Sequence, residues 1–211
     1  MTDQEKPTPQ AAPAPQVPAA PKMPWEEKPV PPVPHDAKEL PLVVEVAASV
    51  ADMVVEAVEL AGQVAIVVPV GRLLDVCRAC KEKLEFTFLV DLTAVDWKER
   101  AEGRFDVVYW LHRFTDSSRL RLKVRVAEGA EVPSVTSVWK TANWMEREVF
   151  DMFGIYFTAH PNLERILTWE GFNGHPLRKD FPIEGIDTGA AIYPDVYPPG
   201  GGPVKGGEGA A

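Results

Sequence analysis

The fold is decided by residues 119–126, Arg-Leu-Arg-Leu-Lys-Val-Arg-Val, in which basic and apolar side chains alternate without a break. Strict alternation predicts a β-strand, because successive side chains point to opposite faces of a sheet. The apolar set then faces a core, and the basic set faces away from it. The basic set is Arg119, Arg121, Lys123 and Arg125. Four neighbouring cations either lie in solvent or bind an acidic partner, and the sequence favours neither interpretation.

Apolar stretches before residues 119–126 predict the rest of the sheet. Two of them, Phe86–Val95 and Phe105–Phe114, are separated by polar loops and predict two further strands. Upstream, Val54–Leu60 and Val64–Val68 flank a turn at Ala61-Gly62-Gln63 and predict a hairpin.

Three segments predict helices. Residues 71–84 are amphipathic, and residues 40–53 predict a short helix with a strand as the alternative. The last helix, residues 138–153, follows helix-start residues at positions 133–137 and ends at Gly154, a natural C-terminal cap. The predicted order is α-β2-α-β3-α. We therefore expect an α+β sandwich, a mostly antiparallel sheet with helices packed on it, followed by an irregular C-terminal docking segment.

Composition divides the chain into three parts. Residues 1–34 hold 11 of the 21 prolines, so we expect a disordered Pro/Ala-rich arm over residues 1–38. One domain covers residues 39–183, and an extended Gly/Pro-rich tail covers residues 184–211. The net charge of −9 argues against nucleic-acid binding by bulk positive charge. No apolar run reaches the roughly 18 residues of a membrane span, so we expect membrane contact to be indirect.

The two cysteines form a Cys77-Arg-Ala-Cys80 motif. It could be a redox dithiol or half of a zinc site, but both sulfurs lie on the apolar face of the predicted helix 71–84, so core packing is the favoured interpretation. Two thiols are too few for a self-contained four-cysteine iron–sulfur cluster. The histidines also lack metal-site spacing, and we expect no metal centre among them. They are His35, His112, His160 and His175.

Residues 146–182, EREVFDMFGIYFTAHPNLERILTWEGFNGHPLRKDFP, combine clustered charges with seven aromatic side chains. The acids Glu146, Glu148 and Asp151 lie near a predicted helix C-terminus, where they oppose the helix dipole and need outside partners. Downstream Arg165, Arg178 and Lys179 can supply them. We expect a lattice of ion pairs locking this segment to the helix, in preference to acid–base catalysis.

Residues 146–182 resemble the signature of the 30 kDa subunit of respiratory complex I, which is the C subunit of the bacterial NADH:quinone oxidoreductase. The shared motifs are Glu146-Arg-Glu148, Asp151-Met-Phe-Gly-Ile155, His160-Pro-Asn-Leu-Glu-Arg-Ile-Leu167 and Gly174-His-Pro-Leu-Arg-Lys-Asp-Phe-Pro182. Upstream, Phe88-Leu-Val-Asp-Leu92, Val95-Asp96, Val132-Pro-Ser-Val135 and the basic strand also fit. The resemblance covers about residues 40–183.

The resemblance implies a structural subunit without catalytic residues or bound cofactors, in the peripheral arm of a proton-translocating enzyme. FMN and Fe-S clusters would lie in partner subunits and carry electrons from NADH to quinone (ubiquinone in many members). The chain would pack against the quinone-site, 49 kDa-like subunit and neighbouring Fe-S subunits, on the cytoplasmic side of the bacterial inner membrane.

The side chains that we expect to contact other subunits belong to the resembling motifs and to the basic strand. They are Glu146, Arg147, Glu148, Asp151, Phe153, His160, Arg165, His175, Arg178, Lys179, Asp180, Arg121, Lys123 and Arg125. Two alternatives stay open. One is the equivalent subunit of a related membrane-bound hydrogenase or dehydrogenase complex. The other is a stand-alone thiol or metal enzyme that uses Cys77 and Cys80.

Overall fold

The computed structural model describes residues 33–50, 53–169 and 171–183. Most of the predicted arm and all of the predicted tail lie outside these residues. The arm was expected to reach residue 38, but His35–Asp36 forms strand β1, which pairs antiparallel with β2. The folded region therefore begins before residue 39. Backbone pairing, which composition does not report, orders these two residues.

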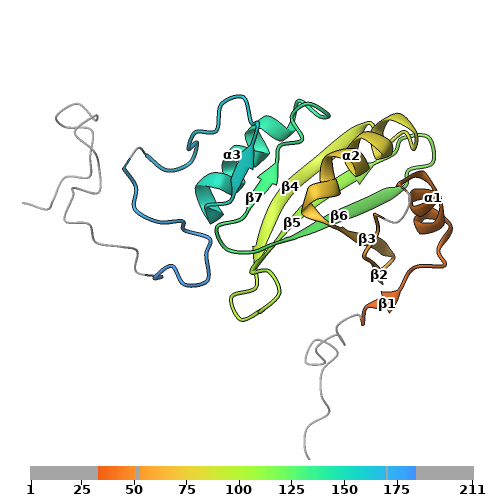
Figure 1. The fold of residues 1–211 in the computed structure, drawn as a ribbon, viewed down its shortest axis with the longest axis horizontal. Helices are drawn as coiled ribbons and strands as arrows, with labels where there is room; N and C mark the ends of the chain where they lie inside the picture. Colours follow the sequence, from red (N-terminus) through yellow and green to blue (C-terminus); the bar gives the residue numbers. More distant parts are fainter. Residues whose placement is uncertain (1–32, 51–52, 170, 184–211) are drawn as a thin grey trace, which may run out of the picture. The chain divides into compact units, whose positions relative to one another are not determined.

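A six-stranded sheet forms the centre of the fold, with strand order β1-β2-β3-β6-β5-β4 (Figure 1). Its remaining strands are β2 Glu56–Leu60, β3 Gln63–Val68, β4 Phe88–Asp96, β5 Phe105–His112 and β6 Arg119–Val126. Every neighbouring pair is antiparallel except β3 and β6, which are parallel. The predicted α+β class and mostly antiparallel sheet are confirmed.

The alternation of basic and apolar residues that predicted β6 matches the alternation of accessible and buried side chains along this strand. Leu120, Leu122, Val124 and Val126 are at most 1% exposed, and they face the same core as β3 and β5. The predicted hairpin is also present, as β2 and β3. Its turn is tighter than expected, because only Ala61 and Gly62 lie between the strands, both with positive φ. Two such residues match the twist of an antiparallel hairpin.

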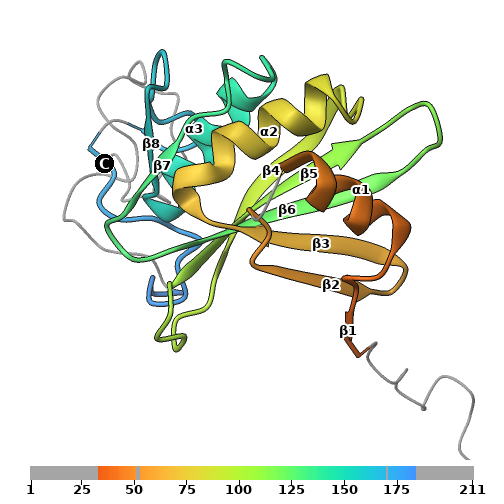
Figure 2. The same cartoon turned by 45° about the vertical axis from the view of Figure 1, so that its right-hand side comes forward.

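All three α-helices contribute side chains to one continuous core on a single face of the sheet. They are α1 Pro41–Val50, α2 Leu73–Glu82 and α3 Ala142–Phe153, with a 3-10 turn, η1 Val70–Arg72, leading into α2. Figure 2 shows α1 and α2 lying over this face. The ambiguous segment 40–53 is thus helical over Pro41–Val50. Among the described residues, no helix has both the length and the apolar character to cross a membrane.

The start of α3 was predicted wrongly. The helix begins at Ala142 rather than residue 138, and its N-cap residue, Thr141, makes no side-chain capping hydrogen bond. The expected cap residues are used elsewhere. Glu131–Pro133 forms strand β7, which pairs in parallel with β8, Tyr156–Thr158. The hydroxyls of Ser134 and Thr136 bond each other at 2.8 Å. Capping residues predict a helix start only where the chain is free to turn there.

Candidate functional site

The C-terminus of α3 is closed by residues that lie more than twenty positions farther along the chain. Four backbone carbonyls at a helix end have no partner within the helix. Here Gly154, at φ +73°, donates its N–H to the carbonyl of Phe150 at 2.9 Å. The next three carbonyls accept from Nδ1 of His175 at 2.9 Å, the N–H of Leu177 at 3.1 Å and Nε of Arg178 at 2.6 Å. The His-Pro-Leu-Arg stretch is therefore a long-range helix cap.

Asp151 holds the next part of the chain against the same helix. Its carboxylate is fully buried and accepts from Nη1 of Arg165 at 2.9 Å and from three consecutive backbone N–H groups at 2.8–3.0 Å. Those N–H groups belong to Ile166, Leu167 and Thr168, and the Thr168 hydroxyl also donates to the carboxylate. Burial raises the pKa of Asp151, but these hydrogen bonds outweigh it and hold the pKa below the usual aspartate value.

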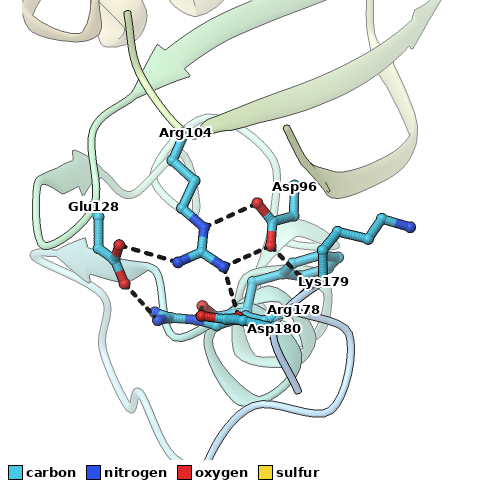
Figure 3. A network of polar contacts seen from close by, with 7 residues as sticks. Asp96, Arg104, Glu128, Arg178, Lys179 and Asp180 are labelled. Carbon is cyan, nitrogen blue, oxygen red and sulfur yellow. Dashed lines mark hydrogen bonds and ion pairs between the residues drawn. The ribbon is translucent and has the colours of Figure 1, made fainter. Parts of the chain in front are cut away.

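Figure 3 shows a second polar network, centred on Arg104. Its guanidinium donates to both carboxylate oxygens of Asp96, at 2.9 and 2.8 Å. It also reaches Asp180 at 2.6 Å and Glu128 at 3.0 Å. The hydrogen bonds from Arg104 lower the pKa of Asp96, whose carboxylate is buried at the end of β4. A paired charge of this kind can be buried because the guanidinium fork satisfies both carboxylate oxygens.

The C-terminal segment, which we define as residues 159–169 and 171–183, joins this network directly. The backbone N–H of Lys179 donates to Asp96 at 2.8 Å, and Arg178 donates to Glu128 at 2.8 Å. Arg178 thus bonds both the end of α3 and the turn after β6. Of the ion pairs predicted for residues 146–182, Asp151–Arg165 is present, whereas Arg178 pairs with Glu128 and Lys179 contributes its backbone N–H to Asp96. These contacts fix the C-terminal segment to α3 and to the ends of two strands.

Glu146 occupies a different environment within α3. It is fully buried, and one carboxylate oxygen accepts the N–H of Val135 at 2.7 Å, while the other finds no hydrogen-bond partner among the described residues. The imidazole of His160 lies 3.9 Å away, but its Nδ1 accepts from Asn162 and its Nε2 faces the carbonyl of Asn143. This pattern fits a neutral ring. Burial raises the pKa of Glu146 to about 7.

Both cysteines are core residues, as the sequence favoured. Cys77 and Cys80 are free thiols with no exposed surface. Burial raises the pKa of Cys80 to about 12 and raises that of Cys77 as well. Because the thiolate is the reactive form, this environment suits packing and not nucleophilic chemistry. Among the described residues, no three His, Cys, Asp or Glu side chains come together to hold a metal ion.

Several residues that we expect to contact other subunits make contacts inside the chain. Glu146, Asp151 and Phe153 are buried, and Phe153 packs edge-on against Phe105 with ring centroids 6.5 Å apart. The side chains of Arg165, His175 and Arg178 are committed to the cap and to the Asp151 site. The contact of these groups with other subunits stays a prediction.

The other expected contact residues differ in exposure, and among them the side chain of His160 is fully buried. Arg147 lies over the ring of Trp144 and donates Nε to the carbonyl of Glu164 at 3.1 Å. The side chains of Glu148, Lys179 and Asp180 are exposed. On β6, Arg125 pairs with Glu56 at 2.6 Å, whereas Arg121 and Lys123 are half-buried on the face of the sheet that points away from the core.

Three residues of these polar contacts were not predicted as site residues from the sequence: Asp96, which appeared only within the Val95-Asp96 motif of the resemblance, Arg104 and Glu128. Asp96 carried a usable signal, because it continues the inward alternation of Leu92 and Ala94 along β4. An acid at a core-facing position needs a buried cation. Nothing in the local sequence pairs Arg104 with Asp180, which lies 76 positions away.

The arrangement leaves large apolar side chains in solvent. Six of them lie on α3, β8 and the C-terminal segment. Ile183, at the end of the described residues, is fully exposed, and the other five are 43–63% exposed. They are Trp144, Tyr156, Leu167, Trp169 and Leu177, and we call them the exposed apolar set. Exposed side chains of this size on an element held rigidly by buried polar contacts are typical of protein–protein interaction sites.

Comparison with known proteins identifies the family of the chain. Residues 66–187 match the family model described as respiratory-chain NADH dehydrogenase, 30 Kd subunit. The chain is 49% identical over 124 residues to the C subunit of the NADH-quinone oxidoreductase of Phenylobacterium zucineum (strain HLK1), covering 59% of each protein. It is 44% identical over 130 residues to the C subunit of the same enzyme from Geobacter sulfurreducens, covering 61% of this chain and 80% of that one.

Among solved structures, the chain is similar to one chain of the membrane-bound sulfane sulfur reductase, an archaeal respiratory membrane complex. The TM-score is 0.59 at 28% identity, over 67% of this chain and 84% of the other. The matched region spans only 59% of the length of the Phenylobacterium relative. The family match nonetheless covers more than half of this chain, including every residue of the α3 cap. The chain belongs to the family of the 30 kDa subunit of the respiratory-chain NADH dehydrogenase.

Proposed function

We propose that the chain is a non-catalytic structural subunit of the peripheral arm of a proton-translocating NADH:quinone oxidoreductase. Its place is on the cytoplasmic side of the bacterial inner membrane, against the quinone-site, 49 kDa-like subunit. The relatives named above are C subunits of that enzyme, which supports the assignment. The observation that carries the docking role is the exposed apolar set, presented on elements fixed by the Asp151 site and the α3 cap.

Burial separates the residues within 146–182 that shape the segment from those that contact a partner. The ion pairs and hydrogen bonds shape the C-terminal segment, and the exposed apolar set contacts the partner. We propose further that the chain holds no cofactor, with FMN and Fe-S clusters in partner subunits. The buried positions of Cys77 and Cys80 support this, since thiols packed in the core are poorly placed to reach a cluster.

The docking role can be tested with one exposed residue and one matched control. Leu167 is 62% exposed in the C-terminal segment, and Val44 is 52% exposed on α1. Leu167→Asp and Val44→Asp are each introduced into the full chain, which carries an affinity tag in its own host. We expect Leu167→Asp to lose co-purifying subunits while its urea midpoint stays unchanged, and Val44→Asp to keep them. Full recovery of the assembled complex with Leu167→Asp would contradict the role of the exposed apolar set.

A related host complex is the second candidate, favoured by the structural similarity to the sulfane sulfur reductase chain. The same purification separates the two. Co-purifying chains that bind FMN and oxidise NADH support the NADH:quinone oxidoreductase. A membrane complex that lacks NADH oxidation supports the related host.

A further inference from the structure

The sheet has a second face that none of the described helices covers. Along each strand, the side chains that alternate with the core residues point to this helix-free face. On β6 they are Arg119, Arg121, Lys123 and Arg125. Beside them, β3 contributes Ala65 and Val67, and β5 contributes Asp106, Val108, Trp110 and His112. Strand β4, next to β5, adds Phe88 and Asp91.

Cations dominate the centre of the helix-free face, although the whole chain carries a net charge of −9. Arg125 is paired with Glu56, but Arg119, Arg121 and Lys123 have no carboxylate within ion-pair distance among the described residues. Elsewhere among the described residues, most arginines form ion pairs with carboxylates, as Arg113 does with Glu45 and Asp116. Like charges on one strand are unfavourable unless something neutralises them.

Arg121 is the most informative of these cations. The central carbon of its guanidinium lies over the Trp110 ring, 4.2 Å from the ring centroid, in a cation–π contact. Its Nε is buried and has no hydrogen-bond partner in the described residues, and burial lowers its pKa with no carboxylate to oppose the effect. Nearby on the same face, Nδ1 of His112 and Oε1 of Gln63 are also buried without a partner. The buried Nε–H of Arg121 is costly without an acceptor, so it points to a ligand that supplies one.

The apolar groups of the helix-free face suit a protein surface. Ala65, Val67 and Val108 are less than 10% exposed beneath the long basic side chains. At the end of the face, Phe88 and Phe114 are exposed and pack on each other with centroids 5.7 Å apart. Aromatic and arginine side chains around a flat, mostly desolvated centre are the composition of protein–protein interfaces.

We propose that the helix-free face binds a carboxylate-bearing surface of a partner protein, with Arg121 as its anchor. A guanidinium held over an aromatic ring keeps its N–H fork available for bidentate pairing with one carboxylate. Discrete carboxylates fit better than a run of phosphates, because Asp91, which has no ion-pair partner among the described residues, lies on the same face and would repel a continuous polyanion. This surface is separate from the exposed apolar set, so the proposal does not depend on the docking role of α3.

Lys123 reports directly on whether the face is covered. The tagged full chain is purified from its host with its bound proteins and treated with a water-soluble acetylating reagent. The same treatment is given to the purified full chain alone. Lys83, which is exposed at the end of α2, is the internal control. We expect acetylation of Lys123 to be at least tenfold slower in the assembly, and that of Lys83 to change less than twofold. Equal rates at Lys123 in both samples would overturn the proposal, even if other subunits co-purify.

Carbodiimide cross-linking identifies the occupant, since it joins an amine to a carboxylate only at contact distance. We expect Lys123 to link to an Asp or Glu of a co-purified protein. Protection of Lys123 that disappears on nuclease treatment or delipidation would assign the face to nucleic acid or lipid and refute the proposal.

The anchor itself is tested with Arg121→Gln. We expect it to lower the salt concentration at which the partner dissociates. The control, Arg78→Gln, removes an exposed arginine on α2 and should leave that concentration unchanged. Urea midpoints of both variants verify that each is folded, and equal salt sensitivity of the two would contradict an anchoring role for Arg121.

Discussion

Asp151→Asn should unlock the C-terminal segment from α3. The substitution keeps the size of the side chain but removes its charge and one of its two acceptor oxygens. In the wild-type chain the carboxylate accepts hydrogen bonds from Arg165, from three backbone N–H groups and from the Thr168 hydroxyl. An asparagine in the same position presents an NH₂ group to some of these donors. The guanidinium of Arg165 then stays partly buried without its anion.

The size of the effect follows from burial. Removing one member of a buried, hydrogen-bonded charge pair costs about 3–5 kcal/mol, and each unanswered backbone donor costs roughly 1–3 kcal/mol where the segment cannot reach water. Part of this is recovered if residues 165–168 move into solvent. We therefore expect a loss of about 3 kcal/mol, a large share of the roughly 5–15 kcal/mol by which domains of this kind are stable.

Two measurements on the purified full chain decide the outcome. Urea denaturation followed by tryptophan fluorescence gives the global free energy of unfolding. Trypsin cleavage after Arg165 and Arg178 reports whether the C-terminal segment detaches. Glu148→Gln is the matched control, because Glu148 is an exposed acid on the same helix. We expect faster cleavage and a lower urea midpoint for Asp151→Asn and neither change for Glu148→Gln.

The pH dependence supplies a further check with a fixed sign. Because the folded chain lowers the pKa of Asp151 below 3.8, its stabilisation is complete at neutral pH and is lost as the pH falls through the folded value. The wild type and Asp151→Asn should thus converge in acid. If the variant unfolds within about 1 kcal/mol of wild type at pH 7, with an unchanged cleavage pattern, then the carboxylate does not hold the segment.

The remaining predictions concern Glu146 and Gly154. The folded chain raises the pKa of Glu146 from 4.5 to about 7. The free energy of unfolding should therefore fall by up to about 3 kcal/mol as the pH rises through this window, because the protonated form stabilises the fold. Urea titrations should show that Glu146→Gln removes this fall, and parallel stability–pH curves for wild type and variant would refute the prediction. Gly154→Ala should cost about 1–2 kcal/mol for the left-handed backbone alone and displace the cap, since its Cβ would meet the His175 ring and lie 2.7 Å from Nη2 of Arg178. Gly129→Ala, which has φ +76° and a Cβ that meets nothing within 4 Å, is its control in the same titration, and equal losses would contradict the crowding argument.

Much of the fold could be predicted because burial along a strand or helix has a period. Residues 119–126 alternate, and the structure places their apolar half in the core and their basic half on the other face. The helix over residues 71–84 was expected from the same reasoning and is present as α2, Leu73–Glu82, with both cysteines inside. Strands β1, β7 and β8 escaped prediction because two or three residues show no period and are ordered by the backbone opposite them.

The candidate site was only half predictable, for a different physical reason. The sequence shows that Asp151 opposes the dipole of its helix and needs a cation, and Arg165 fills that role. It does not show which of several cations will reach which acid, because a partner's position depends on strand register and on the path of the chain. Arg104 illustrates this, since its three carboxylate partners come from β4, from the turn after β6 and from the C-terminal segment.

Because the paired charges lie within the chain and the exposed apolar set lies in solvent, loss of stability and loss of association can be told apart. A substitution in the lattice, such as one at Asp151 or Gly154, acts on the folded chain and changes its stability before any partner is present. A substitution in the exposed apolar set or at Arg121 leaves the free chain folded and acts only on association. Variants that fail to assemble can therefore be sorted by measuring the isolated chain first. A lattice variant that assembles poorly with an unchanged urea midpoint would show that the buried pairs also contact the partner directly, despite their burial within the chain.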